Sequence, residues 1–278
     1  MKIIDIDGFL TAAFTEDLGE RGDVTTDATI PAEAESTAHV VARQAGCIAG
    51  LAVALRCFEI LDENVEIGAL AQDGDVVTAG SRLATVRGAT RSILSAERLA
   101  LNLLGQLSGV ATATRALVDQ VEGTGARIVD TRKTVPLLRE LQKMAVIAGG
   151  GGNHRMGLFD QILIKDNHIE AVGSPAEAVR RARAHVGEEM TIEVEIETLD
   201  DLESVIEAGA DVVMLDNMPP EDMRQAVEQA EGRVLLEASG GITDATVRAV
   251  AESGVDLISV GALTHSSPSL DVALDFER

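Results

Sequence analysis

The pattern of apolar and polar positions becomes regular near residue 126. From there to residue 264, short and nearly continuous apolar runs alternate with amphipathic segments at helical spacing. Continuous apolar runs are typical of strands buried on both faces, and the segments between them are typical of the crossover helices of a parallel sheet. The predicted strands are ARIVDT, DQILIK, TIEVEI, DVVMLD, RVLLEAS and DLISVG, and the predicted helices lie near 134–147, 175–185, 199–208, 220–230 and 243–252.

The residues at the carboxyl ends of these strands favour a closed arrangement. Each predicted strand ends in charged residues or in glycines. In a β/α barrel, such positions converge on one mouth and build the active site. The alternative, a doubly wound open sheet, would bind a ligand only at its switch point. Because six strands are fewer than the usual eight, the fold class predicted for residues 111–264 is an incomplete parallel α/β barrel of about six to seven strands.

The first 110 residues have a different pattern, which predicts a separate α/β domain. Its apolar runs are short and are separated by turn dipeptides such as DG, AG and RG, as in small antiparallel sheets. The predicted elements are an amphipathic helix over 6–14, a turn-rich polar segment over 16–27, a small sheet over 36–88 with a helix near 51–61 laid across it, and a long helix, or two helices broken near Gly109, over 92–121.

Composition limits the classes of partner. The formal net charge is −23 and the chain has no Trp or Tyr, so nucleic acid and anionic membrane surfaces are disfavoured as partners. The acidic excess, with 19 Arg among 23 basic residues, leads to the hypothesis of a surface adapted to a salty cytoplasm. There is no signal-peptide pattern and no apolar run of about 18 residues. Cys47 and Cys57 lack disulfide spacing, so we expect free thiols and a cytoplasmic location.

One window departs from the acidic balance. Between Arg127 and Lys165, seven basic residues accompany three acidic ones, and three of the four lysines of the chain lie there. A basic helix that neutralises acidic neighbours is the simpler interpretation. The clustering of TRK, NHR and IKDNH around four successive glycines instead favours a pocket that grips carboxylates or phosphates.

Carboxylates and glycine loops complete the predicted mouth. Glu195 and Asp216 end two strands, and the final two strands end in SGGIT and GAL, where barrels commonly bind phosphate. Carboxylates beside phosphate loops suit a magnesium-bound pyrophosphate, although ion pairs with barrel lysines would also explain both acids. There is no CxxC, no HExxH and no Ser, His and Asp order, which disfavours acyl transfer and tight zinc binding.

Several segments together resemble the quinolinate phosphoribosyltransferase family, the carboxylating nicotinate-nucleotide pyrophosphorylases. The resemblance runs nearly end to end and is carried by EDLGERGDVTTD, AERLALNLL, DTRKTVPLLRELQKMAV, GGGGNHRMGLFDQILIKDNHI, EVEIET, VVMLDN, EASGGIT and SVGALTHS. It implies transfer of a phosphoribosyl group from 5-phosphoribosyl 1-pyrophosphate to quinolinate, with loss of CO2 and pyrophosphate, to give nicotinate mononucleotide for NAD synthesis. It also implies an N-terminal α/β sandwich over 1–110, completed by 265–278, and a homodimer with shared active sites.

The resemblance assigns roles by motif. Quinolinate and the 5-phosphate would be held by Thr131, Arg132, Lys133, His154, Arg155 and Lys165, with Arg98 entering from the partner subunit. Ribose and Mg²⁺ would be held by Glu195 and Asp216, and phosphate by Ser239, Gly240, Gly241, Gly261 and Ala262. Lys133, Lys165, Glu195 and Asp216 would be the catalytic group.

The chain departs from the family motif at two places. Val135–Leu138 replaces TPGL, and Met144 replaces an aromatic residue; both places are predicted to lie on a helix and to affect packing more than chemistry.

Four alternatives remain at this stage. Two share the fold: a paralogue associated with molybdenum transport, and a nicotinate-specific phosphoribosyltransferase. A third is a Schiff-base aldolase using Lys165, which would leave the carboxylates and phosphate loops without a role. The fourth is a sensor that binds dicarboxylates or phosphates without turnover.

Overall fold

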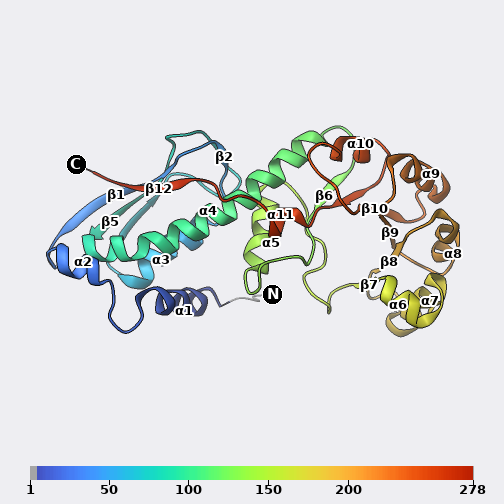
Figure 1. Ribbon diagram of the computed structural model, residues 1–278, viewed down its shortest axis with the longest axis horizontal. Coiled ribbons are helices and arrows are strands. Elements are labelled where there is room, and N and C mark those ends of the chain that lie inside the picture. The colour runs from blue at the N-terminus through green and yellow to red at the C-terminus, as the bar shows by residue number, and fades with distance from the viewer. Residues whose placement is uncertain (1–4, 278) are drawn as a thin grey trace. The chain divides into compact units, whose positions relative to one another are not determined.

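The computed structural model describes residues 5–277, which form two compact units (Figure 1). The first unit contains residues up to 113, residues 140–150 and residues from 266 onward, and the second contains 114–139 and 151–265. The predicted barrel span of 111–264 is thus interrupted by 140–150, which group with the first unit. Within the described chain, no helix is both long enough and apolar enough to cross a membrane.

The first unit is built on a four-stranded antiparallel sheet in the order β12-β1-β5-β3. The C-terminal strand β12 pairs with β1, with Val40 opposite Leu274. Residues far apart in sequence therefore share one sheet. Its strands are β1 (Glu35–Ala42), β3 (Glu66–Ala69), β5 (Arg82–Ala89) and β12 (Val272–Phe276), and a two-stranded ribbon is formed by β2 (Gly46–Cys47) and β4 (Val76–Val77).

The helices of this unit largely follow the predicted pattern. The segment read as polar and turn-rich contains one helix that was missed, and Asp23 caps it by accepting the N–H of Thr26 at 3.0 Å. Cys47 and Cys57 are both buried, and they do not form a disulfide with each other. The helices are α1 (Ile6–Leu18), α2 (Val24–Thr29), α3 (Leu51–Leu61) and α4 (Thr90–Gln120), together with most of α5 (Arg139–Ala148).

Helix α4 is continuous, which confirms the single long helix and excludes the alternative of a break near Gly109. The glycine serves close packing instead. A Cβ atom at Gly109 would lie 2.1 Å from the carbonyl oxygen of Pro268, and one at Gly105 would lie 2.9 Å from that of Leu270. The segment that leads into β12 therefore crosses α4 at a distance that only glycine permits.

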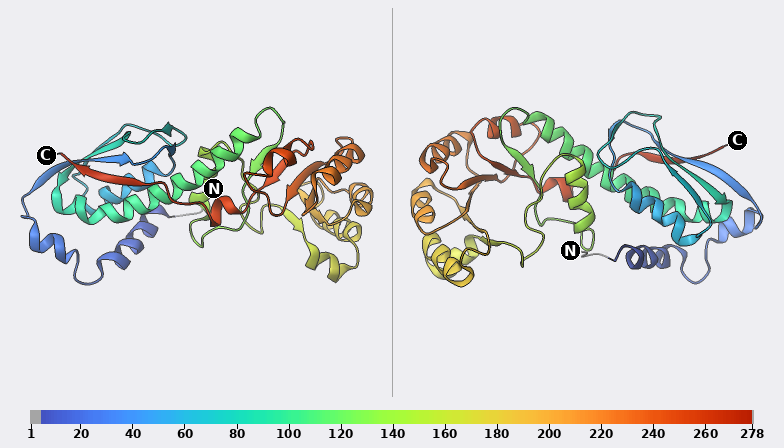
Figure 2. Two further views of the ribbon diagram at one scale, coloured as in Figure 1. Left: turned by 45° about the horizontal axis from the view of Figure 1, so that its top comes forward. Right: turned by 180° about the vertical axis from the view of Figure 1, so that it is seen from behind.

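The second unit is a six-stranded parallel sheet in the order β6-β11-β10-β9-β8-β7. The edge strands β6 and β7 do not pair with each other, and a single bridge from Val129 to Gly152 extends the sheet beside β6. Helices cover the outer face of the curved sheet (Figure 2). This is the predicted incomplete barrel. Its strands are β6 (Arg127–Val129), β7 (Ile162–Ile164), β8 (Ile192–Ile196), β9 (Val212–Asp216), β10 (Leu235–Ser239) and β11 (Leu257–Ser259).

The crossover helices agree with the pattern in position but differ in extent. A short helix, α6, follows β7 directly and was not predicted. The helix expected from residue 134 begins only at Arg139, because Pro136 restricts the preceding residue and Leu137 is left-handed, with φ of 66°. The helices are α6 (Asp166–Val172), α7 (Pro175–Val186), α8 (Leu202–Glu207) after a 3-10 turn (Leu199–Asp201), α9 (Pro220–Ala230), α10 (Val247–Ala251) and α11 (Ala262–His265).

Candidate active site

The carboxyl ends of the parallel strands surround two adjoining cavities in the second unit. The first has a volume of about 270 Å³ and the second about 590 Å³, and Lys133 and Lys165 line both. The first cavity is lined by Thr131, Arg132, Lys133, His154, Arg155, Leu163, Lys165, Met214, Glu237, Ser239 and Ser259. The second is lined by Thr131, Lys133, Lys165, Glu195, Asp216, Asn217, Ser239–Thr243, Ser259–Ala262 and His265.

Hydrogen bonds fix the backbone of the loops that carry the cationic side chains. The fully buried Asp130 follows β6 and accepts the backbone N–H of His154 at 3.0 Å, which joins the two basic loops. The backbone N–H of Lys133 donates to Thr131 Oγ1 at 3.0 Å, and Thr264 Oγ1 donates to the carbonyl of Lys133 at 2.7 Å. Both the backbone N–H and the backbone carbonyl of Lys133 are therefore hydrogen-bonded, which fixes its loop.

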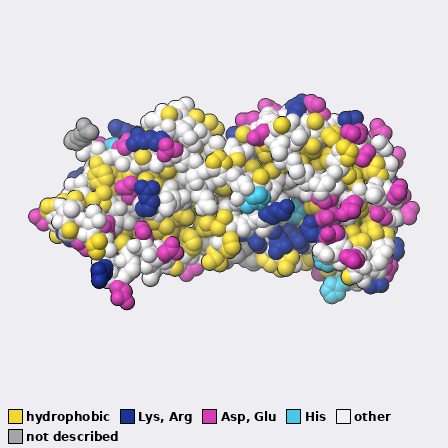
Figure 3. Space-filling view, in the orientation of Figure 1, with side chains coloured by type: hydrophobic (Ala, Val, Ile, Leu, Met, Phe, Trp, Pro, Cys, Tyr) yellow, Lys and Arg dark blue, Asp and Glu magenta, His cyan; other side chains and the backbone are white. Residues whose placement is uncertain are grey.

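Two arginines make the first cavity strongly cationic. Arg155 Nη1 donates to the carbonyl oxygen of Gln161 at 3.2 Å, and Nε of Arg132 is buried without a hydrogen-bond partner among the described residues. Burial, and then the positive charge of Arg132, lower the pKa of Arg155. Two cations that repel each other in a partly buried pocket favour an anionic ligand. Figure 3 shows Lys and Arg side chains gathered on one part of a surface where Asp and Glu are common elsewhere.

Carboxylates and glycines dominate the second cavity. Lys165 Nζ lies 2.5 Å from Glu195 Oε2, so Glu195 does pair with a barrel lysine. Asp216 instead accepts the side-chain amide of Asn217 at 2.6 Å. Gly240 has φ of 96°, and a Cβ atom there would lie 2.1 Å from Asn217 Oδ1, so only glycine allows the backbone to line the cavity at this point.

The donor set of the second cavity fits a magnesium ion. Glu195 and Asp216 present oxygen ligands, and both line a space that is also lined by the loop with Gly240 and Gly241. Mg²⁺ prefers one or two carboxylates together with substrate oxygens and water. These two residues are therefore the ones that would hold it.

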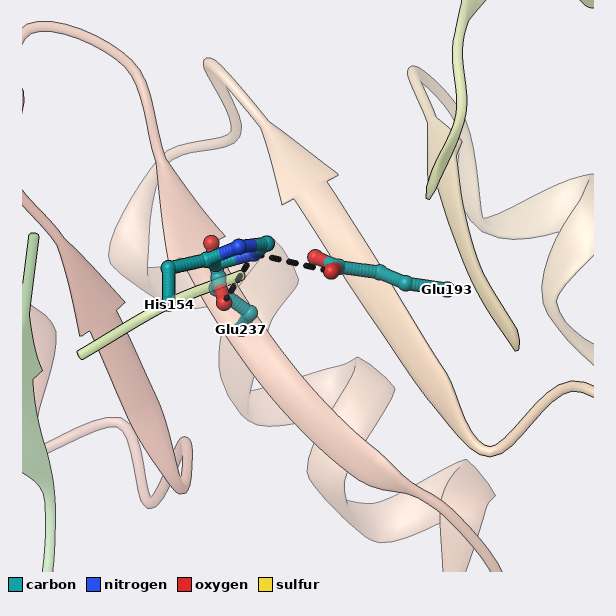
Figure 4. Close-up of side chains that lie close together, drawn as sticks. All are labelled: His154, Glu193 and Glu237. Carbon is teal, nitrogen blue, oxygen red and sulfur yellow. Dashed lines mark ion pairs between the residues drawn. The ribbon is translucent and has the colours of Figure 1, made fainter. Parts of the chain in front are cut away.

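A buried cluster of one histidine and two glutamates lies at the first cavity (Figure 4). His154 Nε2 is 2.9 Å from Glu193 Oε2 and 3.6 Å from Glu237 Oε2. The ligand atoms lie within 4.8 Å of one another, as in metal sites. However, Nδ1 of His154 accepts the backbone N–H of Arg155 at 2.7 Å, so the ring proton is on Nε2. The ring therefore presents an N–H group, not a lone pair, to the carboxylates, and this arrangement suits a proton better than a metal ion.

The structure brings together thirteen of the fourteen predicted site residues. Arg98 is the exception: it lies on α4 in the first unit, with a 68% exposed side chain and an ion pair of 4.0 Å with Glu97. His168, the last residue of the IKDNH motif, is exposed in the first turn of α6, where its Nδ1 accepts the N–H of Lys165. The remaining thirteen are Thr131, Arg132, Lys133, His154, Arg155, Lys165, Glu195, Asp216, Ser239, Gly240, Gly241, Gly261 and Ala262.

Some lining residues were missed in the sequence. Glu193 and Glu237 interrupt otherwise apolar strands, TIEVEI and RVLLEAS, and a charge in a strand buried on both faces is a usable signal. Leu163 and Met214 gave no signal, because apolar residues are expected throughout such strands. Of the two motif departures, Val135–Leu138 precede α5 and so do not lie on a helix as predicted, whereas Met144 lies on α5 as predicted and is half exposed.

The fold and the two cavities define an α/β-barrel protein with a strongly cationic cavity beside one lined by carboxylates and glycines. Comparison with known proteins then gives the family. Residues 23–108 match the family described as quinolinate phosphoribosyl transferase, N-terminal domain, and residues 110–275 match the corresponding C-terminal domain. The chain belongs to the quinolinate phosphoribosyltransferase family.

Individual relatives match over nearly their full length. The probable nicotinate-nucleotide pyrophosphorylase (carboxylating) of Bacillus subtilis is 45% identical over 275 residues, covering 99% of this chain and 94% of that protein. The solved nicotinate-nucleotide pyrophosphorylase of Francisella tularensis has a TM-score of 0.93 at 40% identity, covering 98% of this chain and 96% of that one. A human nicotinic acid phosphoribosyltransferase has a TM-score of 0.64 at 15% identity, covering 99% and 74%, which shows a shared fold alone.

Proposed function

We propose that this protein transfers the phosphoribosyl group of 5-phosphoribosyl 1-pyrophosphate to quinolinate and releases pyrophosphate and CO2. The product is nicotinate mononucleotide, a precursor of NAD. Membership of the family and the names of the relatives support this activity. The observation that carries it is the pairing of two cavities of different chemistry that share Lys133 and Lys165.

The first cavity suits quinolinate. Its cations, Arg132, Arg155, Lys133 and Lys165, match two adjacent carboxylates, while Leu163 and Met214 offer apolar contacts to an aromatic ring. The alternatives of a sensor or a nicotinate-specific enzyme would use fewer of these cations, because neither a phosphate nor a monocarboxylate presents two carboxylates at once.

The second cavity suits the phosphoribosyl donor. Loss of pyrophosphate leaves an oxocarbenium-like ribose, and the carboxylates Glu195 and Asp216 stabilise such positive charge. Mg²⁺ bound by the same two residues would neutralise the leaving pyrophosphate. The backbone of Gly240 and Gly241 contributes N–H groups that favour phosphate oxygens. After transfer, the new pyridinium nitrogen acts as the electron sink for decarboxylation.

The assembly follows the same proposal. The protein acts as a cytoplasmic homodimer in which Arg98 of each protomer enters the active site of the other, consistent with its position outside both cavities of its own second unit and with its high exposure. An acidic surface, with 46 Asp and Glu against 23 Lys and Arg, keeps such a dimer soluble at high salt.

Calorimetry and a CO2-release assay test the activity. Quinolinate and 5-phosphoribosyl 1-pyrophosphate are titrated separately, with and without Mg²⁺, and CO2 release is then measured with quinolinate or with nicotinate as acceptor. We expect turnover with quinolinate only, dependent on Mg²⁺. Turnover with nicotinate, or binding without turnover, would overturn the proposal.

A further inference from the structure

Glu237 is an unusual residue for a pocket that receives anions. It lies on β10, its side chain is fully buried, and it lines the first cavity. Both of its carboxyl oxygens lack a hydrogen-bond partner within residues 5–277. An ionised carboxylate in this position would be removed from water, would accept no hydrogen bond and would lie close to the carboxylates of a bound dianion.

The two glutamates of the cluster differ in their hydrogen bonds. Glu193 Oε2 accepts the side-chain amide of Gln161 at 2.8 Å and faces the Nε2–H of His154 at 2.9 Å. Glu193 Oε2 thus faces two donors, although its Oε1 has none, whereas neither carboxyl oxygen of Glu237 has a donor within hydrogen-bond distance among the described residues. Of two neighbouring buried carboxyl groups, the one without donors retains the proton.

The charged groups around Glu237 support the same assignment. Burial and the negative charge of Glu193 on β8 raise the pKa of Glu237 to about 7, while His154, Lys165 and the hydroxyl of Ser259 on β11 oppose the rise. The group therefore exchanges its proton near neutral pH, which is the range in which a general acid is most effective.

The proposed reaction needs a proton at the first cavity. When the bond between C2 of the pyridine ring and its carboxylate carbon breaks, CO2 leaves and the electron pair stays on C2, next to the pyridinium nitrogen. A C2–H bond must then form, so a proton donor must face this cavity.

We propose that Glu237 is the catalytic acid that donates this proton to C2, with Glu193, which faces the Nε2–H of His154, as the positioning residue that keeps the proton on Glu237. The inference rests on the proposed function, because it concerns the second half of that reaction. The donation leaves Glu237 as a carboxylate, which takes a proton from water once the product has left the open cavity. Without a donor, the carbanion recaptures CO2, and the dicarboxylate nucleotide persists.

Single-turnover measurements of pyrophosphate and CO2 separate the two halves of the reaction. The variant Glu237→Gln keeps the shape and the neutral charge but has no acidic proton, and Glu228→Gln, on the exposed surface of α9, is the matched control. We expect Glu237→Gln to release pyrophosphate within threefold of the wild-type rate but CO2 about 100-fold or more slowly, because general acids contribute about 100- to 10,000-fold. Quinolinate mononucleotide should accumulate, as detected by mass spectrometry.

The outcomes are distinct. CO2 release that keeps pace with pyrophosphate release in Glu237→Gln overturns the proposal, and so does a parallel fall of both rates, which would make Glu237 structural. Should the variant not fold, the wild-type enzyme gives the same answer: CO2 should lag behind pyrophosphate above pH 8 but not at pH 6, and a constant ratio overturns the proposal. A wild-type protein that releases no pyrophosphate from the two substrates would instead refute the proposed function itself.

Discussion

Substitutions of Arg155 and Lys133 test whether the two cavities bind different ligands. Arg155 lines only the first cavity, whereas Lys133 lines both. Replacement by methionine keeps an unbranched apolar stem and removes the charge. Each lost charge-assisted hydrogen bond is worth about 1.5 to 3 kcal/mol, which is roughly a 12- to 160-fold change in a dissociation constant.

We expect Arg155→Met to weaken quinolinate binding by that factor and to leave binding of 5-phosphoribosyl 1-pyrophosphate within about threefold of wild type. Lys133→Met should weaken both ligands, because its ammonium group reaches both cavities. Isothermal calorimetry with each ligand alone measures this pattern. Arg180→Met, which removes the same charge from an exposed position on α7, is the control and should change neither.

Equal weakening of both ligands by Arg155→Met would refute the separation of the cavities. Quinolinate affinity within twofold of wild type in both variants would refute the assignment of the first cavity to the dicarboxylate. A change in the melting temperature beyond that of Arg180→Met would show that the loop itself, not the lost charge, was disturbed.

Four further predictions follow from particular residues. Leu137 has a left-handed backbone where the family motif has glycine, so Leu137→Gly should be about 1 kcal/mol more stable than Leu137→Ala in urea unfolding; equal stabilities would contradict the strain. Burial raises the pKa of Cys57 from 9.0 to about 12, so as the pH rises the thiol ionises in the unfolded state before it does so in the folded state. The free energy of unfolding should therefore fall by about 2 kcal/mol between pH 8 and 10.5, a loss that Cys57→Ala should lack. Asp216→Asn should lower kcat more than it changes the KM for quinolinate, and an unchanged kcat at saturating Mg²⁺ would make Asp216 structural. Mixing inactive Arg98→Ala and Asp216→Asn homodimers should restore up to about half of wild-type activity per mixed dimer, because one of the two sites is then intact; exchange without recovery would place Arg98 outside the partner's site.

The sequence by itself determined most of the element positions in the second unit. Strands buried on both faces must be nearly continuous apolar runs, so all six were visible, and α7 and α9 begin where predicted. It also determined the edge of the sheet at which the candidate site lies. Parallel strands place the residues that follow them, such as Lys165, Glu195 and Asp216, at one edge whatever the curvature of the sheet. Places governed by local backbone geometry were less well predicted. The sequence left open a helix break at Gly109, where the structure has a close crossing, and Leu137 delays the start of α5.

Only the tertiary structure decided which of these residues share a cavity. Glu193 and Glu237 lie 44 positions apart, on strands β8 and β10 that are separated by β9, and a flat sheet would keep their side chains apart. The curvature of the barrel points both inward, where a loop from outside the sheet inserts His154 between them. Which carboxyl group of this cluster holds a proton depends on its burial and on which of its oxygens accept hydrogen bonds. Both are set by distances between segments far apart in the chain, which no local pattern of residues contains.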